Sequence, residues 1–217
     1  MGKKTVTSTP TGFGKHPSKK LQEVFKRRPY QIQCPEKAKI IFLGLDANWN
    51  KEIKTEFFKE TRNYLEDGVK YWKDNGIHTP MLKEIYKWDG KRYLKNTYKG
   101  GGKRYHTQFC KLGFLPKDAE KICFLELLNV CTYGSSTKNM KKFRELLNEN
   151  HLNWIRKIFE LDNFICISKT AKEIINELGG FNRTKNIKVH YHFSYRKITD
   201  KDIEDIRLEL WKYLGKK

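Results

Sequence analysis

The sequence predicts an α/β fold, a three-layer sandwich with a central, mostly parallel four-stranded sheet flanked by helices. Two observations predict it. Four short and continuously apolar segments are typical of strands buried on both faces, and segments with apolar residues at helical spacing separate them. Strands and helices that alternate in this way usually form a parallel sheet covered on both sides.

The four expected strands are the apolar runs of the chain, at Ile40–Leu43, Ile122–Leu128, Phe164–Ile167 and Ile187–Tyr191. Helical spacing predicts the helices between and after them, at Glu52–Leu65, Gly68–Lys73, Met81–Tyr86, Lys138–Leu147, Leu152–Leu161, Lys169–Leu178 and Ile203–Leu214. Ser168 is placed to cap the helix that follows it, and Gly179-Gly180 to end that helix. Thr199 or Asp200 is placed to cap the last one.

Two segments fall outside this alternation. Residues 1–20 are polar, basic and rich in Thr, Ser, Pro and Gly, so we expect a flexible arm, followed by a single α/β domain over residues 21–217. Trp88–Lys111 mixes Lys, Arg and Tyr with a glycine triplet and has no clear period, which predicts a long basic loop across the surface.

The charge of the chain predicts a polyanionic partner. Its 45 basic and 25 acidic residues give a net charge of +20, and a charge of this size favours binding to nucleic acid. The alternative is a lysine-rich surface that serves only solubility. No apolar run reaches the roughly 18 residues of a membrane span, and the N-terminus lacks the apolar stretch of a signal peptide, so we expect a cytoplasmic protein that contacts no membrane.

The five cysteines favour free thiols in a reducing compartment. Their number is odd and no pair has the C-x-x-C spacing of a zinc site. We therefore expect no structural metal, although distant cysteines could still assemble an iron–sulfur cluster.

Polar residues follow each expected strand, and the carboxyl ends of parallel strands meet at one edge of the sheet. Asp46 follows the first strand, Asn129 the second, Ser168 the third and His192 the fourth. Together these side chains would form a hydrolytic site. Each also has a local explanation: Asp46 could cap a helix, Asn129 could occupy a turn, and His192 could pack or, with His190, bind a metal.

Three short motifs resemble the uracil-DNA glycosylase superfamily. GLDANW (residues 44–49) matches the glycine and the acid of the family's first motif, FLELLNV carries the family's Leu-Leu-Asn, and HFSYR (residues 192–196) resembles its His-Pro-Ser. The strand-to-helix junction ICISKTAKEII is also similar, and the resemblance spans roughly residues 39–214.

The resemblance implies an enzyme that flips a damaged base out of DNA and hydrolyses its N-glycosidic bond, without metal or cofactor and as a monomer. Asp46 would orient the water and stabilise the cationic sugar, while His192 would donate to the departing base. Asn129 would pair with the polar edge of the base. The other residues implied to bind the substrate are Gly44, Asn48, Trp49, Phe57, Phe58 and Ser168, and those implied to bind DNA are Ser194, Tyr195, Arg196, Lys197, Lys99, Lys103 and Arg104.

The chain also departs from the family pattern. Ala47 replaces the motif's proline, Asn48 replaces the tyrosine that is held to exclude thymine, Trp49 replaces a histidine and Phe193 replaces the proline after His192. These departures leave open which base is removed. They also support the alternative of a catalytically silent nucleic-acid-binding module with the same fold. A nucleotide-binding α/β enzyme is less favoured, because no strand leads into a glycine-rich phosphate loop.

Overall fold

The structure is a computed structural model that describes residues 12–49, 51, 55–82, 86–88, 93–95, 104–180, 185–195 and 197–216. It confirms the α/β sandwich and adds a strand to the expected four. The main sheet has the strand order β10-β9-β3-β7-β2. Its strands are β10 (Ile187–His190), β9 (Phe164–Ser168), β3 (Ile40–Gly44), β7 (Ile122–Glu126) and β2 (Tyr30–Ile32).

Four of these strands are parallel and the additional one is not. β3 pairs in parallel with β7 and with β9, and β9 pairs in parallel with β10. β2 is an antiparallel edge strand against β7. The register places Gly44 opposite Glu126, so both residues lie at the carboxyl edge of the sheet, where ligands bind in open α/β folds.

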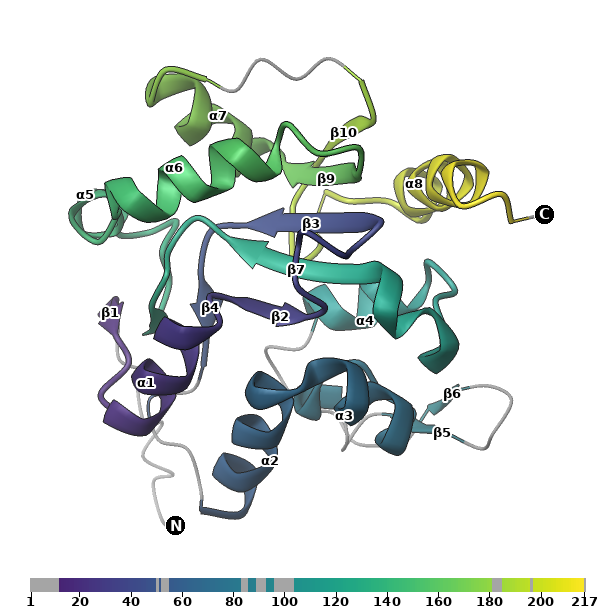
Figure 1. The fold of residues 1–217 in the computed structure, drawn as a ribbon, viewed down its shortest axis with the longest axis horizontal. Coiled ribbons are helices and arrows are strands. Elements are labelled where there is room, and N and C mark those ends of the chain that lie inside the picture. The colour runs from purple at the N-terminus through teal and green to yellow at the C-terminus, as the bar shows by residue number, and fades with distance from the viewer. Residues whose placement is uncertain are drawn as a thin grey trace, which may run out of the picture.

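Helices cover both faces of the sheet, as Figure 1 shows. One face carries α5 (Met140–Glu145), α6 (Glu149–Ile158) and α7 (Lys169–Glu177). The opposite face carries α1 (Lys19–Arg27), α2 (Thr55–Glu66), α3 (Gly68–Asn75), α4 (Arg104–Cys110) and α8 (Asp200–Tyr213). Thr199, one of the two expected caps, caps α8, and its Oγ accepts a hydrogen bond from the backbone N–H of Asp202 at 3.1 Å.

The two hydrophobic cores follow from the alternation of side chains along β3. Phe42 points to the face of α2–α4, where its ring lies 5.1 Å from that of Phe109 and 5.5 Å from that of Phe124. Ile41 and Leu43 point to the other face and belong to the core beneath α5–α7. Because β3 is central, its apolar run is buried along its whole length.

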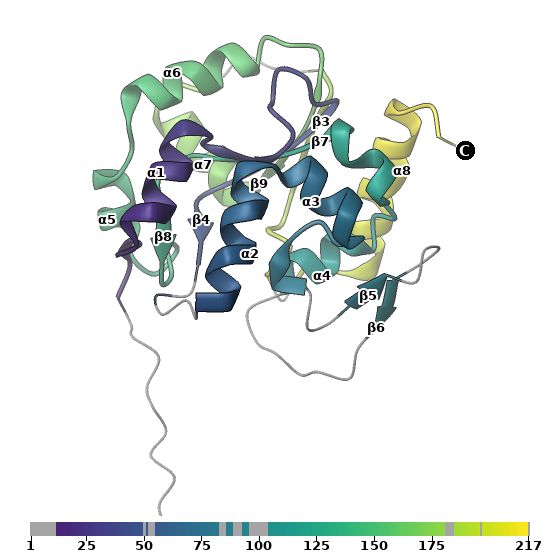
Figure 2. The same ribbon diagram turned by 60° about the horizontal axis from the view of Figure 1, so that its bottom comes forward.

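A second, three-stranded sheet places a loop beside the carboxyl edge of the main sheet. It contains β1 (Gly14–Lys15), β8 (Cys131–Tyr133) and β4 (Ala47–Asn48) in the order β1-β8-β4, and β4 and β8 are seen in Figure 2. The pairing of β1 corrects the expected boundary of the N-terminal arm. Phe13 is only 1% exposed and α1 begins at residue 19, so residues 12–20 belong to the domain; residues 1–11 lie outside the described part.

Several expected elements are shorter or different. The expected loop Trp88–Lys111 contains the strand β6 (Tyr93–Lys95), which pairs with β5 (Tyr86–Trp88) in an antiparallel hairpin, and also contains α4. The expected helix Met81–Tyr86 is also wrong, because a 3-10 turn occupies Pro80–Leu82 and β5 begins at Tyr86. A second 3-10 turn, Pro116–Lys121, precedes β7.

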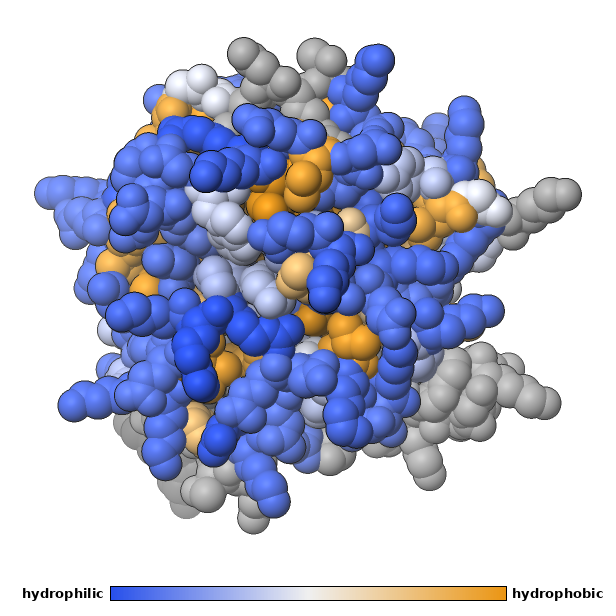
Figure 3. Space-filling view, in the orientation of Figure 1, coloured by the Kyte–Doolittle hydropathy of each residue, from blue (hydrophilic) through white to orange (hydrophobic). Residues whose placement is uncertain are grey.

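The face shown in Figure 3 is mostly hydrophilic, with separate hydrophobic patches between polar side chains. Among the described residues, no helix is both long enough and apolar enough to cross a membrane.

Candidate active site

A cavity of about 600 Å³ opens at the carboxyl edge of the sheet. Three chain segments that follow strands form its walls, together with the loop after β8. Its lining residues are Leu45, Asp46, Asn48, Gly134, Ser135, Ser136, Thr137, Ser168, Lys169, Thr170, Glu173, Tyr191, His192, Ser194 and Tyr195. The volume lies within the range of about 300–1,000 Å³ that is usual for small-molecule sites.

The cavity brings together six of the residues that the sequence indicated. They are Asp46, Asn48, Ser168, His192, Ser194 and Tyr195. They meet because β3, β9 and β10 are parallel and adjacent, so the segments that follow them leave the sheet at one edge.

Asp46 is held through one of its two carboxylate oxygens. The Thr132 hydroxyl and the Asn48 side-chain amide both donate to Oδ2, the latter at 3.2 Å. Asn48 also donates to the carbonyl oxygen of Gly134. Within the described part of the chain no donor reaches Oδ1 of Asp46, so this oxygen can accept a hydrogen bond from a ligand or a water.

The loop after β8 depends on a glycine. Gly134 has φ +82°, and a Cβ built on it would lie 1.8 Å from the carbonyl oxygen of Gly12. Only glycine accommodates both the left-handed backbone and this close approach. The loop therefore passes directly against the N-terminal segment and presents Ser135, Ser136 and Thr137 to the cavity.

His192 is neutral at physiological pH and carries its ring proton on Nε2. Burial lowers the pKa of His192 to about 4. The backbone N–H of Ser194 donates to its Nδ1 at 3.3 Å, and the Ser194 hydroxyl lies 2.6 Å from the same nitrogen. Since Nδ1 accepts, the proton of the neutral ring resides on Nε2, which remains as a donor.

The cavity rim combines an exposed aromatic ring with positive charge. Tyr195 is 45% exposed, and its ring lies 5.5 Å from that of Tyr191. The Lys169 ammonium lies 3.8 Å above the Tyr191 ring, and the ammonium of Lys51 lies 5.1 Å from the ring of Tyr133, the residue that precedes the loop after β8. Stacking surfaces beside cations suit a nucleic acid.

Other residues expected at the site lie elsewhere. Trp49 is 2% exposed and packs in the core, with its ring 6.3 Å from that of Tyr64. Phe58 packs against the same core, and the side chain of Phe57 lies outside the described part. Asn129 does not line the cavity, because β7 ends at Glu126 and Asn129 lies three residues further on.

The expected DNA-binding residues divide in the same way. Ser194 and Tyr195 line the cavity, whereas Lys197 and Arg104 are exposed outside it. The remaining three, Lys99, Lys103 and Arg196, lie outside the described residues.

A histidine-rich cluster lies between the cavity and the core. The ring of His192 lies 4.9 Å from that of Tyr105, the neighbour of His106 in α4, and burial, with the nearby His192, lowers the pKa of His106 to about 3. His106 Nδ1 lies 3.0 Å from Nε2 of the buried His78. His190 is stacked on Phe193 and is a core residue. Among the described residues no group of three or more His, Cys, Asp or Glu side chains could hold a metal ion.

The sequence reasoning missed two features of the edge. One is the loop at residues 134–137, which reaches the cavity only because β8 pairs with β4 and β1. The other is Glu126, the last residue of β7, whose signal was its position as the charged residue within the apolar run FLELL. Comparisons with protein-family models, curated proteins and solved structures found no match to this chain.

Proposed function

We propose that the protein is a monofunctional DNA glycosylase that flips uracil or another deaminated base out of DNA and hydrolyses its N-glycosidic bond, leaving an abasic site. The observation that carries this proposal is the meeting of Asp46 and His192 in one cavity, in a chain with a net charge of +20. A carboxylate that faces a polyanion has no use in binding alone, because it repels phosphate. Its presence favours chemistry at a cationic centre.

Asp46 has the contacts that this chemistry needs. Breaking the N-glycosidic bond leaves positive charge on the sugar, and a carboxylate in a partly buried site stabilises such charge as it develops. The donors on Oδ2 fix the side chain and leave Oδ1 available within the described residues. Oδ1 would orient the water that attacks the sugar.

His192 supplies the complementary interaction. The departing base gains negative charge on its carbonyl oxygen, and the Nε2–H of the neutral imidazole would donate a hydrogen bond to that oxygen. Ser194 fixes the orientation of the ring through Nδ1. His192 would therefore stabilise the negative charge on the departing base, and Asp46 would stabilise the positive charge on the sugar.

The rest of the cavity fits a flipped nucleotide. Serine and threonine hydroxyls of the loop at 134–137 would contact a phosphate, and Lys169 would neutralise it. Tyr195 would stack on a base or fill the space left in the duplex. Free thiols at all five cysteines support a reducing compartment such as the cytoplasm, and we propose a monomer that acts without a cofactor.

The test is a cleavage assay on end-labelled oligonucleotides that carry uracil, hypoxanthine, xanthine or a G·T mismatch, followed by alkali to break abasic sites. We expect alkali-labile product from at least one deaminated base. Asp46→Asn and His192→Ala should each lower its rate about 100- to 1,000-fold. Asp74→Asn, which changes an exposed carboxylate paired with Lys70, is the matched control and should retain the wild-type rate.

Failure of the proposal has a defined form. If no base is released from any oligonucleotide while the protein still binds them in a salt-dependent manner, the proposal that the protein is a DNA glycosylase is refuted. The alternative, a catalytically silent nucleic-acid-binding module, then takes its place.

A further inference from the structure

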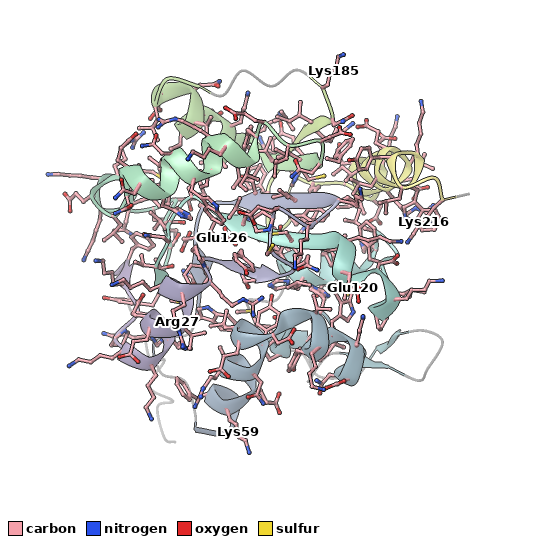
Figure 4. The ribbon with its side chains drawn as sticks, in the orientation of Figure 1. Arg27, Lys59, Glu120, Glu126, Lys185 and Lys216 are labelled. Carbon is pink, nitrogen blue, oxygen red and sulfur yellow. The ribbon has the colours of Figure 1, made fainter. Side chains whose placement is uncertain are left out.

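Glu126 ends β7 at the carboxyl edge of the sheet, directly beside the strand end that leads into Asp46. The register pairs it with Gly44, and its carboxyl group lies over that glycine. A Cβ built on Gly44 would be 2.3 Å from Oε2 of Glu126. Figure 4 labels Glu126 at the end of the β7 arrow, within the ribbon rather than at its periphery.

The carboxyl group of Glu126 has few partners. Among the described residues its one hydrogen bond comes from the Gln31 amide, at a long 3.4 Å, and Gln31 is in turn held by the hydroxyl of Tyr64 at 3.0 Å. The titratable groups that interact electrostatically with the carboxyl group of Glu126 are acids, on β3–β4, α2, α4, β7 and β8: Asp46, Tyr64, Tyr105, Cys123 and Cys131. On α6, His151 contacts the residue through its backbone, with Nε2 2.9 Å from the carbonyl oxygen of Glu126. No cation among the described residues compensates its charge.

Asp118 shows what a structural carboxylate looks like in this protein. It is 1% exposed and accepts hydrogen bonds from Lys216 at 2.7 Å and from the backbone N–H of Leu115 at 3.1 Å. Glu126 has no comparable set of hydrogen-bond donors. A partly buried carboxyl group with one long hydrogen bond and no cation costs stability, so its position at the site edge points to a ligand.

The environment of Glu126 favours its protonated form. Burial raises its pKa well above the ordinary range, and the nearby charge of Asp46 raises it further. A protonated carboxyl group has one O–H donor and one C=O acceptor side by side. An ionised carboxylate would offer acceptors alone.

We propose that Glu126 reads the flipped base: its carboxyl group forms a paired donor–acceptor contact with the amide edge of a keto base, such as the N–H and C=O groups shared by uracil and hypoxanthine. The proposal rests on the proposed function and deepens it by naming the recognised edge. It also replaces Asn129, expected from the sequence to pair with the base, by the residue that ends the strand. Glu126 is not itself among the residues that line the cavity, but it interacts electrostatically with Asp46, which does.

The position of Glu126 also explains why Gly44 carries no side chain. A carboxyl group that reaches across the strand end needs the space above the neighbouring backbone, and any Cβ on residue 44 would occupy it. As a whole residue Glu126 is partly exposed.

The experiment compares excision by wild type, Glu126→Gln and Glu126→Ala over a range of pH, on uracil- and hypoxanthine-containing oligonucleotides. Glu126→Gln keeps a donor and an acceptor but cannot ionise. We expect it to stay within about tenfold of wild type, whereas Glu126→Ala should lower kcat by about 100-fold or more. Glu120→Gln, which alters an exposed carboxylate paired with Lys73, is the matched control, and thermal unfolding monitors the fold.

The pH dependence of excision should differ between wild type and Glu126→Gln. Wild-type excision should decline as pH rises through the raised pKa of Glu126, because the ionised group loses its O–H and repels the base carbonyl. Glu126→Gln should lack that decline. Full activity of Glu126→Ala, or equal loss in both variants, overturns the role of Glu126 while the glycosylase proposal stands. A wild type that releases no base overturns both.

Discussion

The substitution Gly44→Ala should lower excision activity strongly while lowering the free energy of unfolding only slightly. The added Cβ would lie 2.3 Å from Oε2 of Glu126, and ordinary van der Waals contact begins at 3.4 Å. The carboxyl oxygen must therefore retreat by about 1.1 Å. Gly44 lies within β3 and is not among the glycines with positive φ, so alanine adds no backbone strain there.

The two consequences differ in size. A glutamate side chain moves by adjusting its rotamer, which costs about 0.5–1.5 kcal/mol, so the free energy of unfolding should fall by no more than that. Displacing a substrate-contacting group by about 1 Å costs about 100-fold in rate. We therefore expect Gly44→Ala to fold and to lose about 99% of its excision activity.

The assay measures single-turnover excision of uracil beside urea-induced unfolding of the same preparation. Gly12→Ala is the matched control, because its Cβ would meet the nearest atom, in the ring of Tyr133, at 3.9 Å. It should match wild type in both measurements.

Two results would refute the reasoning. Excision by Gly44→Ala within about threefold of wild type would show that the position of Glu126 does not matter. A loss of unfolding free energy well above about 2 kcal/mol would show that the carboxyl group cannot move and that the site is part of a rigid core.

Three further predictions concern the core, an internal ion pair and the rim. Phe42→Ala should lower the free energy of unfolding by about 3–5 kcal/mol, measured by urea denaturation, because its ring packs between Phe109 and Phe124. For Asp118, burial raises the pKa, but the hydrogen bonds from Lys216 and the Leu115 backbone outweigh it and hold the pKa below its usual value. Its contribution is therefore present above about pH 4 and is lost as pH falls through the lowered value; Asp118→Asn should lower the melting temperature at pH 7 and narrow its difference from wild type on acidification. Tyr195→Ala should weaken binding of single-stranded DNA by about 1–3 kcal/mol, measured by fluorescence anisotropy, and an unchanged Kd would remove Tyr195 from the interface.

The sequence predicted most of the sheet because central parallel strands are continuous apolar runs. β3, β7 and β9 coincide with such runs. β10, at the other edge of the sheet from β2, has the sequence Ile-Lys-Val-His, in which apolar and polar residues alternate. β2 was not predicted, because an edge strand of three residues, Tyr-Gln-Ile, contains no apolar run. α4 was not predicted either, because its sequence RYHTQFC has no clear helical period. Phe109 is buried there by tertiary packing against the sheet.

The site was predictable where it follows the main strands. Asp46, Ser168 and His192 line one cavity because the residues after parallel strands lie at one edge of the sheet. Asn129 was not, because the apolar run FLELL suggested two further strand residues after Glu126. The loop at 134–137 could not be foreseen, since it reaches the cavity through the pairing of β8 with two strands that are distant in sequence.

Detection of the free base tests the central claim most directly. Wild type would be incubated with a uracil-containing oligonucleotide, and the released base and the abasic strand would be quantified by mass spectrometry. Hydrolysis of the N-glycosidic bond predicts that the two products appear in equal amounts and that Asp46→Asn suppresses both together. An intact oligonucleotide with no free base, or equal product from Asp46→Asn, would contradict it.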